Sequence, residues 1–285
     1  MTLRQPPVAR VMAVCADDFG LSPGISGGVM QLAQQQRLTS ISCMTNSPDW
    51  LSTAPMLGSL PPSVDAGLHV NLTEGQPLSP RMARIWPRLP ALPVLIARAH
   101  LGLLPRAALR CEIHAQLRAF RDATGASPRY IDGHQHVHHL PIVRDIILDL
   151  AEQVVPLPAV RNTGQVRGTG FGSKRWLIAN TGGRVLARAL AQHQLAHNPV
   201  LLGAYDFRSA DYRALVRGWL AALPPQGGLL FCHPGAASRG DPPDPIGAAR
   251  IRELAYLGSD AFLQDLAAAN VSLGHVWQNR GVPPP

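Results

Sequence analysis

The chain has 285 residues, of which 46% are hydrophobic and 15% charged, so it is long enough to bury a full core and reads as a globular, rather apolar protein. Its net charge of +8 comes from scattered arginines, since Lys174 is the only lysine, and aromatic residues make up only 5%. Nucleic-acid-binding proteins usually interleave basic clusters with aromatic residues or glycine, so this composition argues against that class. Weak attraction to an anionic membrane surface fits it better.

Nothing in the chain indicates a membrane-spanning or secreted protein. No apolar run approaches the length of about 18 residues that a spanning helix needs. The N-terminus lacks the pattern of a signal peptide, and the four cysteines show no Cys-x-x-Cys spacing. We therefore expect buried free thiols and a cytoplasmic location.

Two adjacent carboxylates follow the first apolar run. Residues 11–15 fit a strand that is covered on both faces, and Asp17 and Asp18 stand where it ends. Two unpaired carboxylates would repel each other, and a bound cation would offset that repulsion. The alternative is that one of the two aspartates only caps the turn that follows.

The rest of the chain alternates between predicted helices and strands. Ser22 and Pro23 have the residue types of a helix N-cap and first helical position, and that helix should run to about residue 37. Further helices are predicted at 49–57, 106–125, 141–153 and 174–197, the last with a break at Gly182 and Gly183. Further strands are predicted at 38–44, 64–70, 130–139, 159–161, 200–203, 228–233 and 270–274. The alternation predicts one α/β domain over 1–285, with seven or eight βα units and a loose tail at 279–285.

Three of the predicted strands end at or next to a histidine. These are His69, His134 and His233. A single histidine at such a position is usually a structural hydrogen-bonding residue. Because a parallel α/β fold gathers the C-terminal ends of its strands at one face, we expect these imidazoles to meet the two carboxylates there. Together they would make a divalent metal site with open positions for water.

Residues 75–105 depart from the βα rhythm. The segment holds six prolines and many apolar residues, and it follows the strand that carries His69. Two interpretations stay open, a lid over the site and a helical hairpin packed on the flank of the barrel. As a lid, its apolar, arginine-flanked character would fit a lipid-linked sugar better than a free oligosaccharide.

Five motifs occur in the order seen in one known family. They are Ala16-Asp17-Asp18-Phe19-Gly20-Leu21-Ser22, Leu38-Thr39-Ser40, Gly67-Leu68-His69, Asp132-Gly133-His134-Gln135-His136-Val137-His138 and Cys232-His233-Pro234. Over about residues 11–275 the chain resembles the YdjC-type carbohydrate deacetylases, which include chitooligosaccharide deacetylases and deacetylases of glycosylated hopanoid lipids. The resemblance implies an irregular (β/α) barrel of seven to eight units with its site at the C-terminal ends of the strands. It also implies a metal-dependent hydrolase that removes an N-acetyl group from an N-acetylglucosamine-containing carbohydrate or glycolipid.

The resemblance also implies roles for particular residues. By matching position, Asp18, His69 and His134 would bind the metal, Asp17 would be the catalytic base, and His233 an acid near the leaving amine. Magnesium is the usual metal of the family, whereas ligand softness alone would favour zinc for one carboxylate and two imidazoles.

Three further residues are expected around this site. Arg161 matches an arginine that faces the site in similar sequences. Asp132 is expected to orient an imidazole from behind. His136 would share a strand face with His134, which makes it a reserve ligand.

Other functions use similar residues. A phosphoesterase would more often need a second cation and further carboxylates at strand ends. A non-catalytic sugar-binding protein on the same fold would need neither Asp17 beside a ligand nor His233 opposite it. The expected partner is an amino-sugar substrate, free or lipid-linked, with peripheral membrane contact at most and no nucleic acid. A homodimer is an option that the sequence leaves open.

Overall fold

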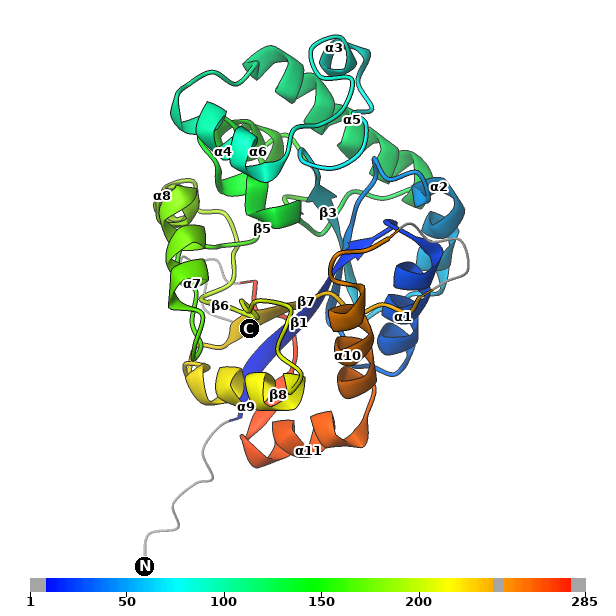
Figure 1. Cartoon of the computed structure of the whole chain (residues 1–285), viewed down its shortest axis with the longest axis vertical. Coiled ribbons are helices and arrows are strands. Elements are labelled where there is room, and N and C mark those ends of the chain that lie inside the picture. Colours follow the sequence, from blue (N-terminus) through cyan, green and yellow to red (C-terminus); the bar gives the residue numbers. More distant parts are fainter. Residues whose placement is uncertain (1–8, 238–242, 278–285) are drawn as a thin grey trace, which may run out of the picture.

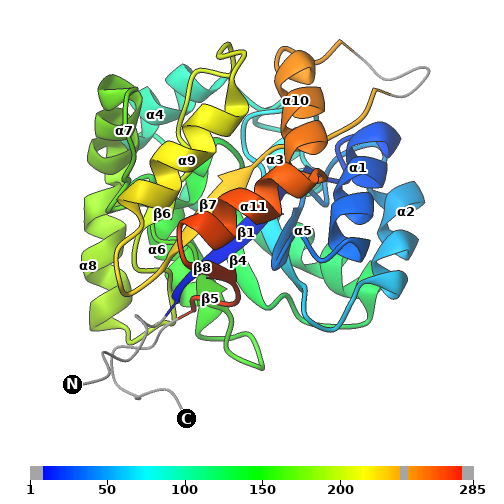
Figure 2. The same ribbon diagram turned by 90° about the horizontal axis from the view of Figure 1, so that it is seen from below.

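A curled parallel sheet organises the molecule, and helices surround it in both views (Figures 1 and 2). The computed structural model describes residues 9–237 and 243–277, so the predicted tail at 279–285 lies outside the described residues. The strand order is β5-β4-β3-β2-β1-β7-β6, with β8 paired to β1. The strands are β1 Arg10–Phe19, β2 Ser40–Cys43, β3 Asp65–Val70, β4 Tyr130–Gly133, β5 Ala159–Val160, β6 Leu201–Leu202, β7 Gly228–Cys232 and β8 Val271–Leu273.

The two edges of the sheet approach each other. Val166, a few residues beyond β5, forms an isolated parallel bridge to Leu201 of β6. Every strand pair is parallel, so the carboxyl ends of the strands gather at one end of the curl. The predicted irregular α/β barrel is therefore confirmed, as a half-barrel with very short strands at its edges.

The central strand is longer than predicted. β1 runs to Phe19 because its last residues still pair with β2. The register shifts between Ala16 and Phe19, and Asp18 has a φ of 69°, so the end of the strand is a bulge. Neighbouring side chains on a regular strand point to opposite faces, and a bulge re-aims one of them. This irregularity takes Asp18 out of the regular alternation, so that its side chain need not point away from that of Asp17.

Helices connect the strands. They are α1 Pro23–Gln34, α2 Trp50–Thr53, α3 Pro80–Ala83, α4 Leu92–His100, α5 Arg106–Thr124, α6 Val143–Ala151, α7 Gly172–Ile178, α8 Arg184–Gln192, α9 Tyr212–Ala222, α10 Gly247–Leu257 and α11 Asp260–Ala268. Shorter turns of other helix types are η1 Ala54–Ser59, η2 His134–His139 and η3 Ala179–Gly183. The predicted cap is confirmed, because the Ser22 hydroxyl accepts a hydrogen bond from the Ile25 amide.

The predicted break in the 174–197 helix is also confirmed. The chain passes from α7 through η3 to α8, with a distorted Gly182 between them. A Cβ at Gly182 would lie 2.0 Å from the carbonyl oxygen of His139, so only glycine lets these two segments pack this closely.

One predicted strand is partly wrong. β4 ends at Gly133, and His134–His139 form the helical turn η2, in which Gln135 and His136 have positive φ. A Cβ on Gly133 would lie 2.9 Å from the His138 amide nitrogen, because the chain folds back on itself here. The run of histidines therefore does not alternate between two faces as it would on a strand.

Among the described residues, the structure has no helix both long enough and apolar enough to cross a bilayer.

Candidate functional site

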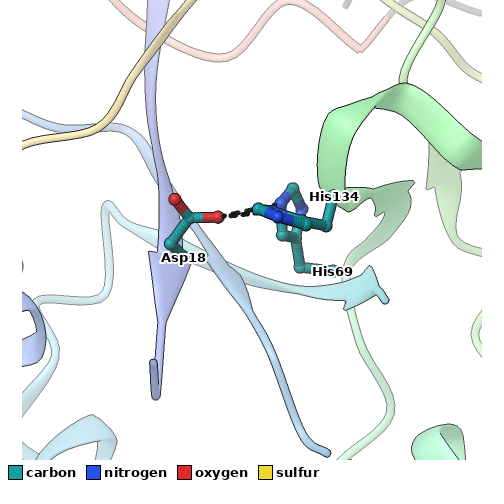
Figure 3. A group of neighbouring side chains, drawn as sticks. All are labelled: Asp18, His69 and His134. Atoms are coloured by element: carbon teal, nitrogen blue, oxygen red, sulfur yellow. Dashed lines mark hydrogen bonds and ion pairs between the residues drawn. The ribbon is translucent and has the colours of Figure 1, made fainter. Parts of the chain in front are cut away.

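Three buried side chains meet at the carboxyl end of the sheet (Figure 3). Asp18 comes from β1, His69 from β3, and His134 from the first residue after β4. Nδ1 of His134 lies 2.9 Å from Oδ1 of Asp18, and Nε2 of His69 lies 3.4 Å from the same oxygen. Each residue offers one ligand atom, and these atoms all lie within 4.8 Å of one another. The structure thus brings together all three residues that the sequence assigned to a metal.

Each member of this cluster contacts a further charged side chain. Nδ1 of His69 lies 2.6 Å from Asp132, which directs Nε2 of that ring toward Asp18. The Arg250 guanidinium donates to the other oxygen of Asp18 at 2.8 Å. Glu74 lies 3.0 Å from Nε2 of His134. Sequence reasoning predicted Asp132 for this position and missed Arg250 and Glu74.

The electrostatics of the cluster fit a divalent cation. Burial disfavours the charged form of His69, but the carboxylates of Asp132 and Asp17 outweigh it and raise its pKa to about 10. Burial also disfavours the charged form of His134, but the Asp18 carboxylate outweighs this effect and raises the pKa of His134 to about 9. The pKa of Asp18 is lowered, because Arg250 and His134 outweigh burial. The surrounding carboxylates therefore stabilise positive charge here, and the donor set of one carboxylate and two imidazoles suits a metal.

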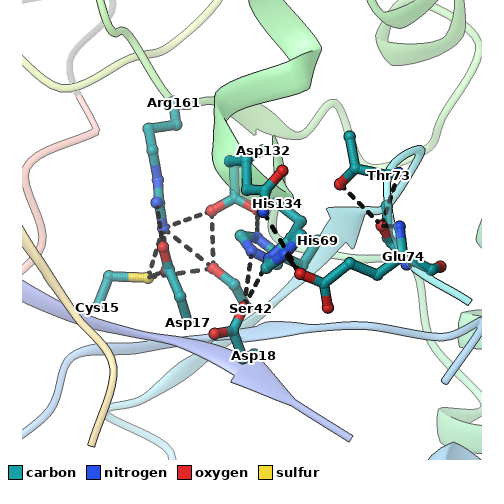
Figure 4. Close-up of polar contacts among 12 residues, drawn as sticks. Cys15, Asp17, Asp18, Ser42, His69, Thr73, Glu74, Asp132, His134 and Arg161 are labelled. Carbon is teal, nitrogen blue, oxygen red and sulfur yellow. Dashed lines mark hydrogen bonds and ion pairs between the residues drawn. The ribbon is translucent and has the colours of Figure 1, made fainter. Parts of the chain in front are cut away.

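A second buried network lies beside the cluster (Figure 4). Arg161, with no exposed surface, donates to both oxygens of Asp17 at 2.8 and 2.7 Å and contacts Asp132 at 2.5 Å. Ser42 of β2 donates to Asp132 at 2.7 Å. Arg161 thus lies buried behind the site, where it links Asp17 to the carboxylate behind His69.

This network contains a second group of potential ligands. Cys15, Asp17 and Asp132 also offer atoms within 4.8 Å of one another. The Arg161 guanidinium already contacts all three, including the Cys15 sulfur at 3.0 Å. Burial raises the pKa of the Cys15 thiol to about 12, so the thiol stays protonated. An arginine, and not a metal ion, supplies the cation for this group.

A cavity of about 650 Å³ opens over the cluster. Its polar lining includes Asp17, Asp18, His134, His233 and Arg250. Its wall is largely aliphatic and is made by Leu21, Ile25, Leu92, Ile96, Leu140, Leu177, Ile178, Ile246 and Ile251. The lining of the site therefore combines charged groups with an aliphatic surface suited to a nonpolar part of a ligand.

The 75–105 segment shares features of both interpretations. Its helix α4 turns Leu92 and Ile96 toward the cavity, while Leu95 is fully buried in the core. The segment therefore packs on the barrel and also forms part of the cavity wall.

His233 follows β7 and lines the cavity. Its amide donates to Glu253 at 2.5 Å, and its buried Nδ1 has no hydrogen-bond partner among the described residues. Its ring packs against Phe207 and Phe231. Burial lowers the pKa of His233 to about 4, so its ring is neutral at pH 7.

The interpretation of His136 needs correction. Because η2 replaces the predicted strand, His136 shares no strand face with His134 and lies outside the ligand cluster. Its ring packs edge-on against Phe231 and beside His139, where it lines the cavity.

These features define the class of protein, which is a barrel-like α/β protein with a candidate cation site at the carboxyl edge of its parallel sheet. The family model described as YdjC-like protein matches residues 11–268, and the chain belongs to that family. A mouse protein named carbohydrate deacetylase is 32% identical over 174 residues, covering 59% of this chain and 54% of that protein. A Proteus mirabilis protein named chitooligosaccharide deacetylase is 32% identical over 156 residues, covering 51% of this chain and 57% of that one. The chain thus spans little more than half the length of these relatives.

The fold also matches a solved structure. A crystal structure from Enterococcus faecalis V583, named as a candidate for cellobiose-phosphate cleavage, superposes with a TM-score of 0.71 at 19% identity. The match covers 94% of this chain and 98% of that one. At this identity the likeness extends to the fold alone.

Proposed function

We propose that this protein is a metal-dependent hydrolase that removes the N-acetyl group from an N-acetylglucosamine-containing carbohydrate or glycolipid. The observation that supports this proposal most directly is the cluster of Asp18, His69 and His134. Asp17 lies beside the cluster, and His233 lines the same cavity. The names of the relatives from mouse and Proteus mirabilis support the choice of an amide on an amino sugar.

The cation would be bound by Asp18, His69 and His134. When bound, it supplies Lewis acidity toward water and toward the amide carbonyl. The resemblance to the family supports magnesium, while the two imidazole donors support zinc. Asp132 orients His69 from behind, and Arg250 keeps one oxygen of Asp18 engaged so that the other faces the imidazoles.

Proton transfer would fall to two residues that lie on the cavity. Asp17 accepts a proton as water adds to the amide carbon, and Arg161 fixes the orientation of its carboxylate. His233 then protonates the nitrogen as the C–N bond breaks, releasing acetate and the free amine. Since His233 is neutral in the resting protein, it takes up a proton from solvent as negative charge develops beside it, and the proton on Asp17 returns to solvent after the products leave.

The apolar wall supports a glycolipid over a short free oligosaccharide. Leu92 and Ile96 of α4 line the cavity together with Leu177 and Ile178 of α7. Sugar hydroxyls gain nothing from such a surface, whereas a lipid aglycone removes it from water at about 25 cal/mol for each Å².

Acetate release tests both parts of the proposal. We expect release from a lipid-linked N-acetylglucosamine and slower release from N,N′-diacetylchitobiose. Leu92→Ser with Ile96→Ser should depress the glycolipid reaction and spare chitobiose. Leu51→Ser, on an exposed position of α2, is the matched control. Equal losses on both substrates would contradict the glycolipid assignment, and no acetate from either would contradict the deacetylase.

Among the rival functions, the phosphoesterase loses support. A phosphoesterase would more often need a second cation, and the second group of ligand atoms already surrounds Arg161. A sugar-binding protein without turnover is separated from the proposal by the same acetate assay.

A further inference from the structure

Two long segments of this chain carry no acidic residue. Asp and Glu are absent from 75–111 and from 153–205, although the chain has 18 of them elsewhere. The first segment contributes α3 and α4, and the second contributes α7, η3 and α8. Both segments keep several exposed arginines, among them Arg88, Arg98 and Arg184.

These two segments lie side by side at the cavity. Nε2 of His100 at the end of α4 lies 3.0 Å from the Thr181 carbonyl oxygen in η3, which continues directly from α7. Leu92 and Ile96 of α4 line the same cavity as Leu177 and Ile178 of α7. The acid-free segments therefore form one side of the cavity mouth.

The outer surface of this side is unusually apolar. Leu101, Leu103 and Trp176 are exposed by 71%, 63% and 65%. We use the name α4–α7 rim for five exposed apolar side chains on this side. They are Val94, Leu101, Leu103, Trp176 and Leu177. Leu177 belongs to both surfaces, since it is half-exposed and also lines the cavity. The apolar exterior is thus continuous with the apolar wall inside.

The charges beside the rim are free for a partner. Arg88, Arg98 and Arg184 form no ion pair with any carboxylate in the part of the chain that the structure describes, whereas Arg106 and Arg110 pair with Asp145 and Asp149 of α6. Arg98 lies over the Trp86 ring at 5.7 Å, which keeps its guanidinium at the surface.

We propose that the α4–α7 rim docks onto an anionic lipid bilayer. Aliphatic side chains and a tryptophan suit the boundary between headgroups and acyl chains, and unpaired arginines suit lipid phosphates. The bilayer is the partner with the complementary charge, and the continuity through Leu177 gives a lipid a nonpolar path from membrane to cavity. This inference rests on the proposed function only in that deacetylation of a glycolipid gives docking its purpose. Binding to the bilayer itself needs no turnover.

Vesicle co-sedimentation tests the docking without any substrate. The probes are vesicles of phosphatidylcholine alone and of phosphatidylcholine mixed with phosphatidylglycerol, each at low and at raised salt. Wild type should bind the anionic vesicles, bind the neutral ones much more weakly, and lose part of its binding in salt. No binding of wild type to anionic vesicles would overturn the proposal.

Paired variants locate the surface. Leu101→Ser with Trp176→Ser should weaken binding by about tenfold or more, because each side chain leaves an apolar environment. Arg88→Gln with Arg98→Gln should weaken it by about fivefold for each charge removed and reduce its salt dependence.

The matched controls change the same kinds of residue elsewhere. Leu51→Ser with Leu263→Ser alters exposed leucines on α2 and α11, and Arg118→Gln with Arg217→Gln alters exposed arginines on α5 and α9. Thermal unfolding of every variant checks that it folds.

Equal binding by rim and control variants would overturn the assignment. So would a change of oligomeric state in the rim variants without wild-type vesicle binding, since the rim would then join copies of the chain. Acetate release without vesicle binding would remove the docking and leave the deacetylase intact.

Discussion

Arg161 holds Asp17 in a buried two-point ion pair, with its two terminal nitrogens 2.8 and 2.7 Å from the two carboxylate oxygens. The same guanidinium contacts Asp132, which in turn contacts His69. The proposed base and the proposed ligands are thereby parts of one hydrogen-bonded structure. Such a planar two-point contact fixes the direction of a carboxylate, which a single point charge cannot do.

Removing an imidazole of the cluster should abolish metal binding. His69→Ala and His134→Ala each delete one of three ligand atoms that lie within 4.8 Å of one another. We expect wild type to bind one divalent ion per chain, and both variants to lose saturable binding of Mg²⁺ and Zn²⁺ in calorimetry and elemental analysis. His193→Ala is the control, because this histidine is paired with Glu152 at the end of α8, outside the cluster. Equal metal content in all four proteins would refute the assignment.

Metal binding should release protons. The pKa values of His69 and His134 stand at about 10 and about 9 in the metal-free protein, so both rings are charged at pH 7 and must lose a proton to bind a cation. Titrations of Mg²⁺ or Zn²⁺ in two buffers of different ionisation enthalpy should show this release, and affinity should rise with pH up to about 10. No difference between the buffers would contradict it.

The same histidines give a stability prediction for the metal-free protein. Their folded pKa values lie above the ordinary value of 6.5, so the folded state binds protons more tightly than the unfolded state does. Their contribution is complete below pH 6.5 and is lost as the pH rises toward 9 and 10. In the presence of a chelator, the melting temperature of wild type should fall more across this range than that of a variant with His134→Gln. A parallel decline of the two proteins would rule this out.

Asp17→Asn should separate binding from chemistry. The substitution keeps the shape of the side chain but removes a proton acceptor, and loss of general-base help typically costs about 10²–10⁴-fold in turnover. We expect the variant to bind the metal like wild type and to release acetate more slowly by that factor. Because Arg161 then lacks one of its buried partners, unfolding by urea should be measured alongside. Full activity on a substrate that wild type deacetylates would show that Asp17 is not the base.

The sequence predicted most of the fold because its signals are local. Ser22 before Pro23 marks a helix start, Gly182 and Gly183 mark a break, and short apolar runs mark buried strands. The predicted strand that the structure contradicts, through His134–His139, is wrong for a long-range reason. The chain turns back over Gly133 there, and no local pattern records the close approach of His138.

The site was predictable only in part, for the same reason. Asp18, His69 and His134 stand at strand ends, where a parallel fold gathers its functional groups. Arg250 is one of many scattered arginines and reaches Asp18 across 232 residues of sequence, so nothing near it in the chain marks its role. Glu74 follows the His69 strand closely, and that position was the only signal that could have suggested it.

The last prediction concerns Glu253, a fully buried carboxyl group next to the backbone of His233. It accepts hydrogen bonds from the Tyr205 hydroxyl and from the His233 amide. Burial raises its pKa from 4.5 to about 7, so its folded pKa lies above the unfolded one. Its contribution to stability is therefore complete below pH 4.5 and is lost as the pH rises to about 7.

Glu253→Gln does not titrate, and its amide can accept from His233 while donating to the Tyr205 oxygen. We expect its urea-unfolding free energy to lack the decline that wild type shows between these two pH values. Glu253→Leu leaves both donors without a partner and should cost about 1–3 kcal/mol for each buried group. Identical pH profiles for wild type and Glu253→Gln would show that this carboxyl group keeps an ordinary pKa.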